Sequence, residues 1–384
     1  MAEIFNDRSV LSKNYVPAKL ITRDAEIEEV LWLIQPMLSR GDPKNALIYG
    51  KSGTGKTVVT RYALDEMNRR IQAKKTNIVS VFINCGDTKT TPQILMRIME
   101  KIAPETPMPK GLATSEYYRK LWDAVNMQHT SLIVVFDEIN HLSDYNILYV
   151  LSRAGENQYI NFENTIGIIG LSNNLFFSEH LEPRIISSLS PHNMVFPPYT
   201  ADQLIKILAD RAVLAFQPDV LDVDVVPLCA ALSAQEHGDA RKALILLDNA
   251  GAMAERGNAA TVTEFHVREG YEKMAHDCVV DMVATLPLQS KLVLYSIIEL
   301  TAIEKHPTTG QIEERYRTVC EHAQFPVMSR TTISKLVSEL ETIGFVNAPI
   351  VNRGRRGRTR KITLQVDVER VKATLLADPI VGCI

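Results

Sequence analysis

A glycine-rich segment near the N-terminus constrains this chain more than any other feature. Residues 50–57 fill every fixed position of the pattern G-x-x-x-x-G-K-[ST], the phosphate-binding P-loop. A short apolar run at 45–49 precedes it, and apolar residues follow it at helical spacing. Strand, glycine-rich turn and helix are the context that this motif requires. The segment therefore predicts a nucleotide-binding protein.

The loop supplies the groups that hold a nucleoside triphosphate. Its glycines let the backbone fold tightly around phosphate oxygens, and the helix N-terminus adds partial positive charge. We expect Lys56 to reach the β- and γ-phosphates and the Thr57 hydroxyl to hold Mg²⁺. The residues expected to bind the nucleotide here are Gly50, Lys51, Ser52, Gly53, Thr54, Gly55, Lys56, Thr57 and Val58.

Apolar runs alternate with helical patterns through the first half of the chain. The runs that are typical of strands are 45–49, 78–84, 132–138, 165–173 and 193–196. Helical patterns at 91–102 and 115–127 lie between them. This alternation predicts a parallel sheet covered on both faces by helices. From Tyr199 to about Ala275 the sequence shows only helical periodicity, which indicates roughly four further helices.

The C-terminal part has the order of a winged helix. A break near Asp277 is expected to start it. Its helices are expected to begin at Leu286 and to span 309–321 and 329–343, before strand-like runs at 345–351 and 361–366. We therefore expect three regions: a nucleotide-binding core, 1–198, that includes an N-terminal segment, 1–23; a helical lid, 199–276; and a winged-helix DNA-binding domain, 277–384.

Basic residues gather toward the C-terminal end. The net charge of the chain is −3, but residues 280–384 contain 14 Lys or Arg against 11 Asp or Glu. Six of the nine residues in 353–361 are basic, and the glycines among them let the backbone approach a partner closely. Between two strands, this turn is typical of a wing that grips DNA phosphates. A solvated basic loop or a localisation-type signal are the alternatives.

The helix expected at 329–343 has the pattern of a recognition helix. Its apolar residues form one stripe, which leaves short hydroxyls and two cations facing outward, toward phosphates and base edges. The residues expected to bind DNA are Arg330, Thr331, Thr332 and Lys335 on this helix, and Arg353, Arg355, Arg356, Arg358 and Arg360 on the wing.

Polar residues follow two of the predicted strands. Asp137 and Glu138 end an apolar run, at the sheet edge where open α/β folds place ligands. One carboxylate is suited to orient Mg²⁺, so we expect Asp137 to join Thr57 there, and Glu138 to polarise the water that attacks the γ-phosphate. Asn173 ends the next strand and is expected to help place that water. Two solvated acids in a turn are the alternative for the carboxylates.

Two arginines are candidates for contacts with the nucleotide. Arg184 comes after the fourth predicted strand, separated from it by a short helix. A guanidinium there could reach the nucleotide of a neighbouring subunit. The alternative is an ordinary surface arginine. Arg241 opens a helix of the lid region, in Gly-Asp-Ala-Arg. There it could couple the position of the lid to the nucleotide, or it could be an ordinary exposed arginine.

Composition excludes some classes of protein. No apolar run approaches the ~18 residues of a membrane span, and the N-terminus lacks the basic and apolar regions of a signal peptide. The five cysteines are scattered without a C-x-x-C pair, which argues for reduced thiols and against a zinc site. We expect a cytoplasmic, nucleoid-associated protein with no membrane partner.

Together these motifs resemble those of AAA+ ATPases and, more narrowly, of the archaeal origin-recognition initiators related to the eukaryotic origin recognition complex. The resemblance covers nearly the whole chain, including the run at 148–153, the stretch at 237–244 and the winged helix. Departures are mild. Ile139-Asn140 replaces a more usual Ile-Asp, which bears on how the preceding carboxylates are held.

The resemblance implies named roles for the residues above. It implies a Walker A motif at 50–57, a Walker B motif at Asp137-Glu138, sensor 1 at Asn173, the arginine finger at Arg184 and sensor 2 at Arg241.

It also implies contacts outside these motifs. Tyr15, Pro17, Arg23 and Tyr199 are expected near the adenine, and an insertion at 88–110 is expected to touch DNA. The implied cofactors are ATP or ADP and Mg²⁺. The implied partners are duplex origin DNA, the replicative helicase and further copies of the initiator.

The sequence leaves three functions open. The first is a DNA-binding initiator that uses slow ATP hydrolysis as a switch, which the basic wing favours. The second is an ATP-driven AAA+ motor or chaperone-like enzyme whose winged helix contacts proteins. The third is an ATP-dependent transcription regulator.

Overall fold

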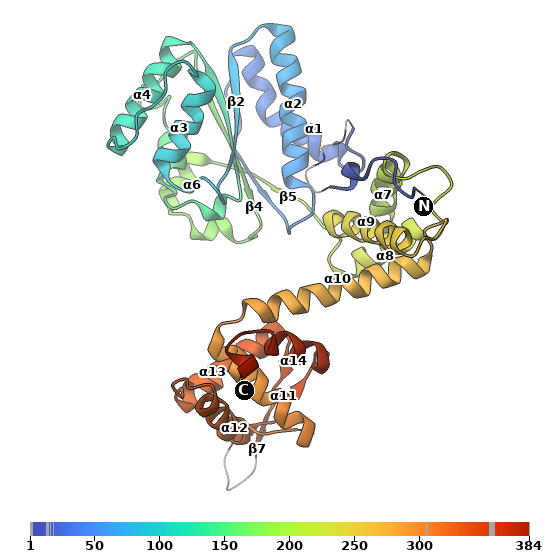
Figure 1. Cartoon of the computed structure of the whole chain (residues 1–384). Coiled ribbons are helices and arrows are strands. Elements are labelled where there is room, and N and C mark those ends of the chain that lie inside the picture. Colours follow the sequence, from blue (N-terminus) through green and yellow to red (C-terminus); the bar gives the residue numbers. More distant parts are fainter. Residues whose placement is uncertain are drawn as a thin grey trace. The chain divides into compact units, whose positions relative to one another are not determined.

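The computed structural model describes residues 3–12, 15, 17, 19–304, 306–352 and 358–383, without the side chains of 275–278, 350–352 and 358. The chain divides into two compact units, Met1–Glu269 and Gly270–Ile384. In Figure 1 the first unit runs from blue to yellow along the sequence and the second from orange to red.

A five-stranded parallel sheet forms the centre of the first unit. Its strands are β1 (Ala46–Tyr49), β2 (Ile78–Asn84), β3 (Ser131–Asp137), β4 (Ile166–Ser172) and β5 (His192–Val195), in the order β2-β3-β4-β1-β5. All four neighbouring pairs are parallel. Strands this rich in Ile, Val and Leu are typical of sheets buried on both faces, so the predicted parallel sheet is confirmed.

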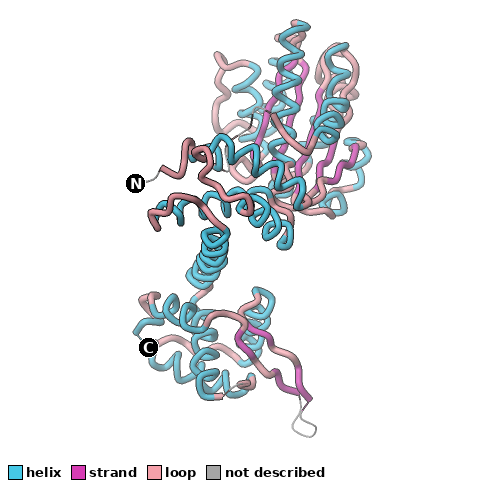
Figure 2. Tube along the Cα trace, turned by 90° about the vertical axis from the view of Figure 1, so that its right-hand side faces the viewer, coloured by secondary structure: helices cyan, strands magenta, loops and turns pink. Residues whose placement is uncertain are grey.

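Helices cover both faces of this sheet, as Figures 1 and 2 show. Successive side chains of a strand point to opposite faces. On one face, Val134 and Phe136 of β3 pack with the helices α3 (Thr91–Ile102), α4 (Thr114–Met127), α5 (Asn146–Ser152) and α6 (Pro183–Leu189). On the other face, Ile133 and Val135 pack with α1 (Asp24–Ile34) and α2 (Lys56–Lys74). With both faces sealed, the carboxyl ends of the strands are left for chemistry.

The lid helices belong to the same compact unit. They are α7 (Ala201–Ala215), α8 (Val225–Glu236), α9 (Ala240–Arg256) and the first residues of α10 (Glu264–Thr285). The N-terminal segment packs on them: the ring of Phe5 lies tilted against that of Phe216, with centres 4.8 Å apart, and Arg8 pairs with Asp248 at 2.6 Å. The structure thus places Phe5 and Arg8 on the lid, although we expected the N-terminal segment to belong to the core.

The second unit has the elements of a winged helix. Its helices are α11 (Leu288–Ile303), α12 (Thr309–His322), α13 (Arg330–Ile343) and α14 (Val368–Leu376). Its strands pair antiparallel as β6 (Val346–Asn347) with β9 (Thr363–Leu364), and β7 (Ile350–Asn352) with β8 (Arg358–Arg360). Among the described residues no single helix is long and apolar enough to cross a membrane, although the bent pair of α10 and α11 passes that test when joined.

We expected the helical lid to end at a break near Asp277, and the structure has no break there. The helix α10 runs without interruption from Glu264 to Thr285. Between Gly270 and Pro287 the sequence contains neither glycine nor proline, the residues that most often end a helix. The two compact units divide at Gly270, inside this helix, so our boundary at 276/277 stays a proposal.

Candidate nucleotide site and DNA-binding surface

The P-loop joins β1 to α2 in a conformation that favours glycine. Gly53 and Gly55 have φ of +74° and +95°, in the left-handed region. Gly50 leaves no room for a side chain, since a Cβ there would lie 2.7 Å from the carbonyl oxygen of Phe196. The loop leads directly into the N-terminus of α2, where free backbone N–H groups and the helix dipole favour an anion.

Lys56 is buried at the start of α2, and its ammonium group is held by oxygen atoms alone. Nζ donates hydrogen bonds to the carbonyl oxygens of Gly50 (2.6 Å) and Lys51 (2.9 Å) and to Oδ1 of Asn173 (2.7 Å). Burial lowers the pKa of Lys56 to about 8, although the charge of Asp137 raises it. A desolvated cation at this position is suited to phosphate oxygens.

Thr57 and Asp137 meet beside Lys56. The Thr57 hydroxyl donates a hydrogen bond to Oδ2 of Asp137 at 3.0 Å. Burial raises the pKa of Asp137, and the hydrogen bond from Thr57 lowers it. A hydroxyl and a carboxylate are hard oxygen donors, and Mg²⁺ at nucleotide sites takes few protein ligands, with water and phosphate supplying the others. These two residues therefore fit the expected Mg²⁺.

Glu138 follows Asp137 in a left-handed conformation, with φ of 54°. Its carboxylate lies near Gly86 and the Asn84 amide, because a Cβ on Gly86 would approach Oε2 of Glu138 to 2.7 Å and Oδ1 of Asn84 to 3.0 Å. Asn84 is the register partner of Asp137 across β2 and β3, so the ends of both strands contribute to one edge. Glu138 and Asn84 line the same cavity as Lys56.

The structure separates the other two core candidates. Asn173 follows β4 and contacts Lys56, as described above. Arg184 lies on α6, outside the lining of the cavity, where Nε donates to Oε2 of Glu182 at 2.7 Å. Its side chain is 56% exposed, and its Cζ lies 5.4 Å from the centre of the Tyr149 ring. Arg184 is therefore an exposed side chain that does not line the cavity of its own chain.

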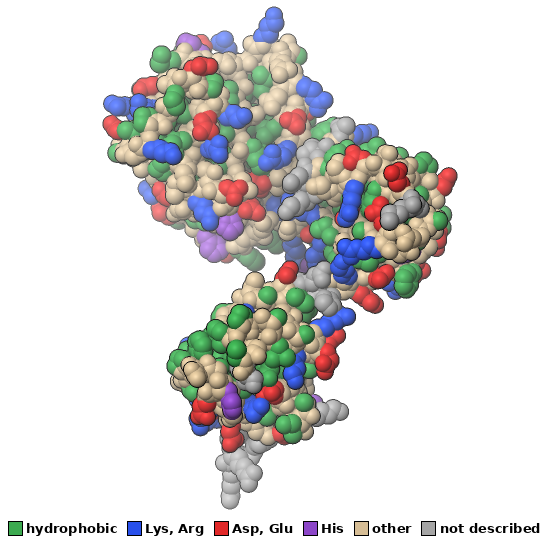
Figure 3. All heavy atoms as spheres, viewed as in Figure 1, with side chains coloured by type: hydrophobic (Ala, Val, Ile, Leu, Met, Phe, Trp, Pro, Cys, Tyr) green, Lys and Arg blue, Asp and Glu red, His purple; other side chains and the backbone are tan. Residues whose placement is uncertain are grey.

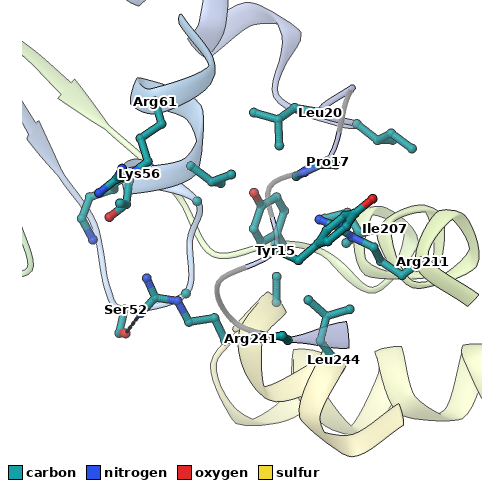
Figure 4. Close-up of a pocket in the computed structure, with 18 of the residues that line it drawn as sticks. Tyr15, Pro17, Leu20, Ser52, Lys56, Arg61, Ile207, Arg211, Arg241 and Leu244 are labelled. Carbon is teal, nitrogen blue, oxygen red and sulfur yellow. Dashed lines mark hydrogen bonds between the residues drawn. The ribbon is translucent and has the colours of Figure 1, made fainter. Parts of the chain in front are cut away.

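The lid reaches the P-loop through the start of α9. Nη1 of Arg241 donates to Oγ of Ser52 at 3.5 Å, and the backbone N–H of Ala240 donates to the carbonyl oxygen of Gly53 at 3.2 Å. Asp239 caps α9 by accepting hydrogen bonds from backbone N–H groups. Figure 4 shows Arg241 rising from the lid toward Ser52. The structure thus brings the predicted Arg241 to the predicted loop.

These residues line a cavity of about 510 Å³ between core and lid. One end carries the P-loop, Lys56 and the carboxylates. The rest of the wall comes from the N-terminal segment and from the lid. The lining residues of that second part include Tyr15, Pro17, Leu20, Ile21, Tyr199, Ile207, Arg211 and Leu244. The end with the P-loop suits phosphates, and the aromatic and aliphatic side chains of the other end suit a flat base, although Ser12, Lys19 and Asp210 also line that part.

Arg23 does not line this cavity, although we expected it near the adenine. The side chain is 2% exposed. Its Nη2 donates to the carbonyl oxygens of Thr54 (3.1 Å) and Pro197 (2.6 Å), and its Cζ lies 4.1 Å from the centre of the Tyr199 ring. The structure therefore places Arg23 against the P-loop as a support, and that role was not predictable from the local sequence.

Sequence reasoning missed other lining residues. Arg61 and Arg211 both line the cavity, one from α2 and one from α7. Arg61 stacks on Phe82, with Cζ 3.9 Å from the ring centre. The only available signal was a cation within an otherwise helical pattern, which surface helices show everywhere.

On the winged helix the predicted DNA-binding residues of α13 differ in their surroundings. Thr331 and Lys335 are exposed, and Arg330 lies 3.5 Å from a carboxylate oxygen of Glu313. Thr332 shares a hydrogen bond of 2.9 Å with the hydroxyl of Ser329, which caps the helix. Thr331, Lys335 and Arg330 therefore face solvent, whereas Thr332 also supports the cap.

The wing is described only in part. Arg353, Arg355 and Arg356 lie outside the described residues, as does the side chain of Arg358. Arg360 on β8 is 26% exposed, donating from Nη1 to Oγ of Ser338 at 2.7 Å and pairing with Glu341 at 3.5 Å. This network ties the wing to α13. On the face seen in Figure 3, basic and acidic side chains are interspersed.

Three protein-family models match the chain in the order that its motifs predict. They are an AAA domain over residues 39–169, a Cdc6 AAA+ ATPase-type lid domain over 205–272, and a CDC6 C-terminal winged helix domain over 281–374. The predicted fold class, an AAA+ core with a helical lid and a winged helix, is confirmed.

Curated relatives extend this match over nearly the whole length. An ORC1-type DNA replication protein of Methanosarcina acetivorans is 41% identical over 380 residues, 98% of this chain and 91% of that protein. The chain belongs to the ORC1-type DNA replication protein family. Another member, from Pyrococcus furiosus, is 41% identical over 387 residues, covering 98% and 90% of the two chains.

Solved structures of the family agree. The Aeropyrum pernix ORC1 protein in complex with DNA superimposes with a TM-score of 0.80 at 38% identity, over 100% of this chain and 99% of that one. Cdc6p of Pyrobaculum aerophilum shares the fold, with a TM-score of 0.62 at 22% identity over 99% of both chains. The resemblance to origin-recognition initiators is thereby confirmed.

Proposed function

We propose that this ORC1-type protein is a replication initiator in which ATP acts as a switch for binding duplex origin DNA. The observation that carries the proposal is the double contact of the lid with the P-loop, through Arg241 and Ala240. A nucleotide bound between them contacts core and lid at once. Its presence and its γ-phosphate would then bias the position of the lid.

In the proposed hydrolysis, the residues at the sheet edge divide the work. Thr57 and Asp137 would hold Mg²⁺, which neutralises phosphate charge when it is bound. Glu138 would orient and polarise the attacking water, with Asn173 beside the γ-phosphate. Lys56 would exchange its present acceptors for phosphate oxygens. We propose slow turnover, suited to a switch rather than to a motor.

Arg184 would act as an arginine finger in a neighbouring copy of the initiator. Its exposure and its distance from the chain's own cavity support this proposal. Copies assembled on DNA would then complete each other's sites.

Contacts with DNA would come from two places. The winged helix would present Arg330, Thr331, Thr332 and Lys335, together with the basic wing. The insertion at 88–110 would add a second contact through the outer side of α3, where Arg97 and Lys101 are exposed. The similar Aeropyrum pernix ORC1 protein, solved in complex with DNA, supports this proposal. The complex would recruit or help to load the replicative helicase, in the cytoplasm and on the nucleoid.

The proposal is tested by footprinting on the organism's own origin DNA with ATP, with ADP and without nucleotide. We expect site-specific protection that changes with nucleotide. Protection of no duplex, together with rapid ATP turnover stimulated by a protein, would favour the AAA+ motor whose winged helix contacts proteins. Specific protection at promoters and not at origins would favour a transcription regulator.

A further inference from the structure

Arg211 is a buried cation, and one of its guanidinium nitrogens has no partner in the part of the chain that the structure describes. It lies on the lid helix α7 and is 7% exposed, and its Nη1 has no hydrogen-bond acceptor among the described residues. Burying an unpartnered N–H group costs free energy, and burying a charge costs more. No carboxylate of the described chain lies within ion-pair distance of it. An unpartnered buried donor of this kind is rare in folded proteins, and a ligand that accepts from it is one explanation.

The surroundings of Arg211 set it apart from the phosphate end of the cavity. Its Cζ lies 4.4 Å from the centre of the Tyr15 ring, and Ile207 and Leu244 line the cavity with it. Figure 4 shows Arg211 reaching from α7 to Tyr15, away from Lys56 and Ser52. Burial lowers the pKa of Arg211, while the nearby Asp210 raises it.

We propose that Arg211 is the residue of the lid that contacts the purine base, donating a hydrogen bond to a ring nitrogen while Tyr15 holds the plane of its guanidinium. This inference rests on the proposed nucleotide binding. A flat guanidinium against an aromatic ring offers stacking surfaces suited to a flat heteroaromatic base. Phosphate is anionic and strongly hydrated, and Lys56 at the other end of the cavity is the cation suited to bind it.

The proposal predicts a combination that a structural arginine would not show. In Arg211→Met the apolar stem is kept, and the buried charge and its unsatisfied donor are removed. The nucleotide-free protein should therefore melt at the same temperature as the unaltered protein or higher, because replacing a buried unpaired charge by an apolar side chain is neutral or stabilising. ATP affinity should nevertheless fall by about 10- to 100-fold, the loss of one charge-assisted hydrogen bond.

Two ligands separate the base from the phosphates. Binding of ATP and of ribose 5-triphosphate, which lacks only the base, is measured by equilibrium titration on the full chain. We expect Arg211→Met to weaken ATP and to leave ribose 5-triphosphate unchanged. Lys206→Met is the matched control, since it removes an exposed cation of the same helix outside the cavity, and it should change neither affinity.

The outcomes are distinct. Unaltered ATP affinity in Arg211→Met overturns the inference, and so does an equal loss for both ligands, which would place Arg211 on the ribose or the phosphates. A lower melting temperature together with weaker binding of both ligands also overturns it. If the unaltered protein binds no ATP, the proposed function falls as well. Single-atom analogues (1-deaza-, 3-deaza- and 7-deaza-ATP) add a check: one should bind weakly to the unaltered protein without further loss in Arg211→Met.

Discussion

Arg23 donates a hydrogen bond from Nη2 to the carbonyl oxygen of Thr54 at 3.1 Å, across 31 residues of sequence. The same nitrogen donates to Pro197, where the chain leaves the sheet for the lid. One buried side chain therefore ties the phosphate-binding loop to the connection between core and lid. Arg23 makes these contacts without lining the cavity.

Replacing Arg23 by Met should weaken ATP binding at a distance. The substitution removes the Arg23 donor from the carbonyl oxygens of Thr54 and Pro197, which we expect to cost about 1–3 kcal/mol of unfolding free energy and to loosen the P-loop. Denaturant unfolding and ATP titration measure the two effects. Arg70→Met is the control, since it breaks an ion pair on the outer side of α2 and should leave ATP affinity unchanged. Full ATP affinity in Arg23→Met would show that the loop needs no such support.

Lys56→Ala should abolish measurable binding of ATP and ADP while the fold is retained. The substitution removes charge-assisted hydrogen bonds, each worth roughly 1.5–3 kcal/mol. Equilibrium titration together with circular dichroism checks both parts. An affinity like that of the unaltered protein would remove Lys56 from the site.

ATP affinity should depend on pH above neutrality. The pKa of Lys56 is about 8 in the nucleotide-free protein, and phosphate favours the charged amine, so binding takes up a proton once the pH exceeds that value. We expect affinity to fall about tenfold between pH 7 and pH 9. The same depressed pKa means that the nucleotide-free fold gains stability as the pH rises from about 8 toward 10.5. Calorimetry in buffers of different ionisation enthalpy counts the protons, and zero uptake at pH 9 would contradict this account.

Glu138→Gln should bind ATP and Mg²⁺ and hydrolyse more slowly, because an amide does not polarise water as a carboxylate does. The similar size of Gln preserves the packing near Gly86. Single-turnover hydrolysis separates chemistry from product release. A rate equal to that of the unaltered protein would assign the water to another residue.

The wing and the recognition helix should differ in their effect on DNA binding. Arg355→Ala with Arg356→Ala should weaken binding to all duplexes and flatten the slope of log K against log salt by about 1 for each phosphate that is no longer neutralised. Thr331→Ala with Lys335→Ala should instead change the preference among sequences, with less effect on slope. Binding to origin and random duplexes is measured across several salt concentrations. Arg370→Ala on α14 controls for removal of charge elsewhere, and an unaltered slope in the double arginine variant would exclude a role of the wing in DNA binding.

Much of the fold could be predicted because buried parallel strands consist of continuous runs of apolar residues. The strand expected at 78–84 matches β2 residue for residue, and the helix expected at 91–102 matches α3. The end of the lid could not be predicted in this way. Periodicity weakens along α10, and only the absence of a helix-ending residue after Gly270 indicates that the helix continues.

The residues of the candidate site likewise differ in how far the sequence predicts them. Residues in motifs, such as Lys56 and Asp137, carry a signal in their spacing, and the structure brings them to one cavity. Arg23 contacts Thr54 and Arg211 contacts Tyr15, partners 31 or more positions away that a local pattern does not contain. Their surroundings come from tertiary packing, so the family resemblance named Arg23 without its contacts, and Arg211 was not predicted at all.

The three oxygen acceptors around Lys56 have a consequence for which anions the protein takes up. An ammonium group has three N–H donors, and Gly50, Lys51 and Asn173 supply three acceptors for this one, so an anion that binds here competes with the loop itself. A single phosphate group has few oxygens to offer in place of these acceptors. A polyphosphate chain has more, and Arg241, which reaches Ser52 of the same loop, is a further cation for it. We therefore expect the loop to favour polyphosphates over small anions of the surrounding solution.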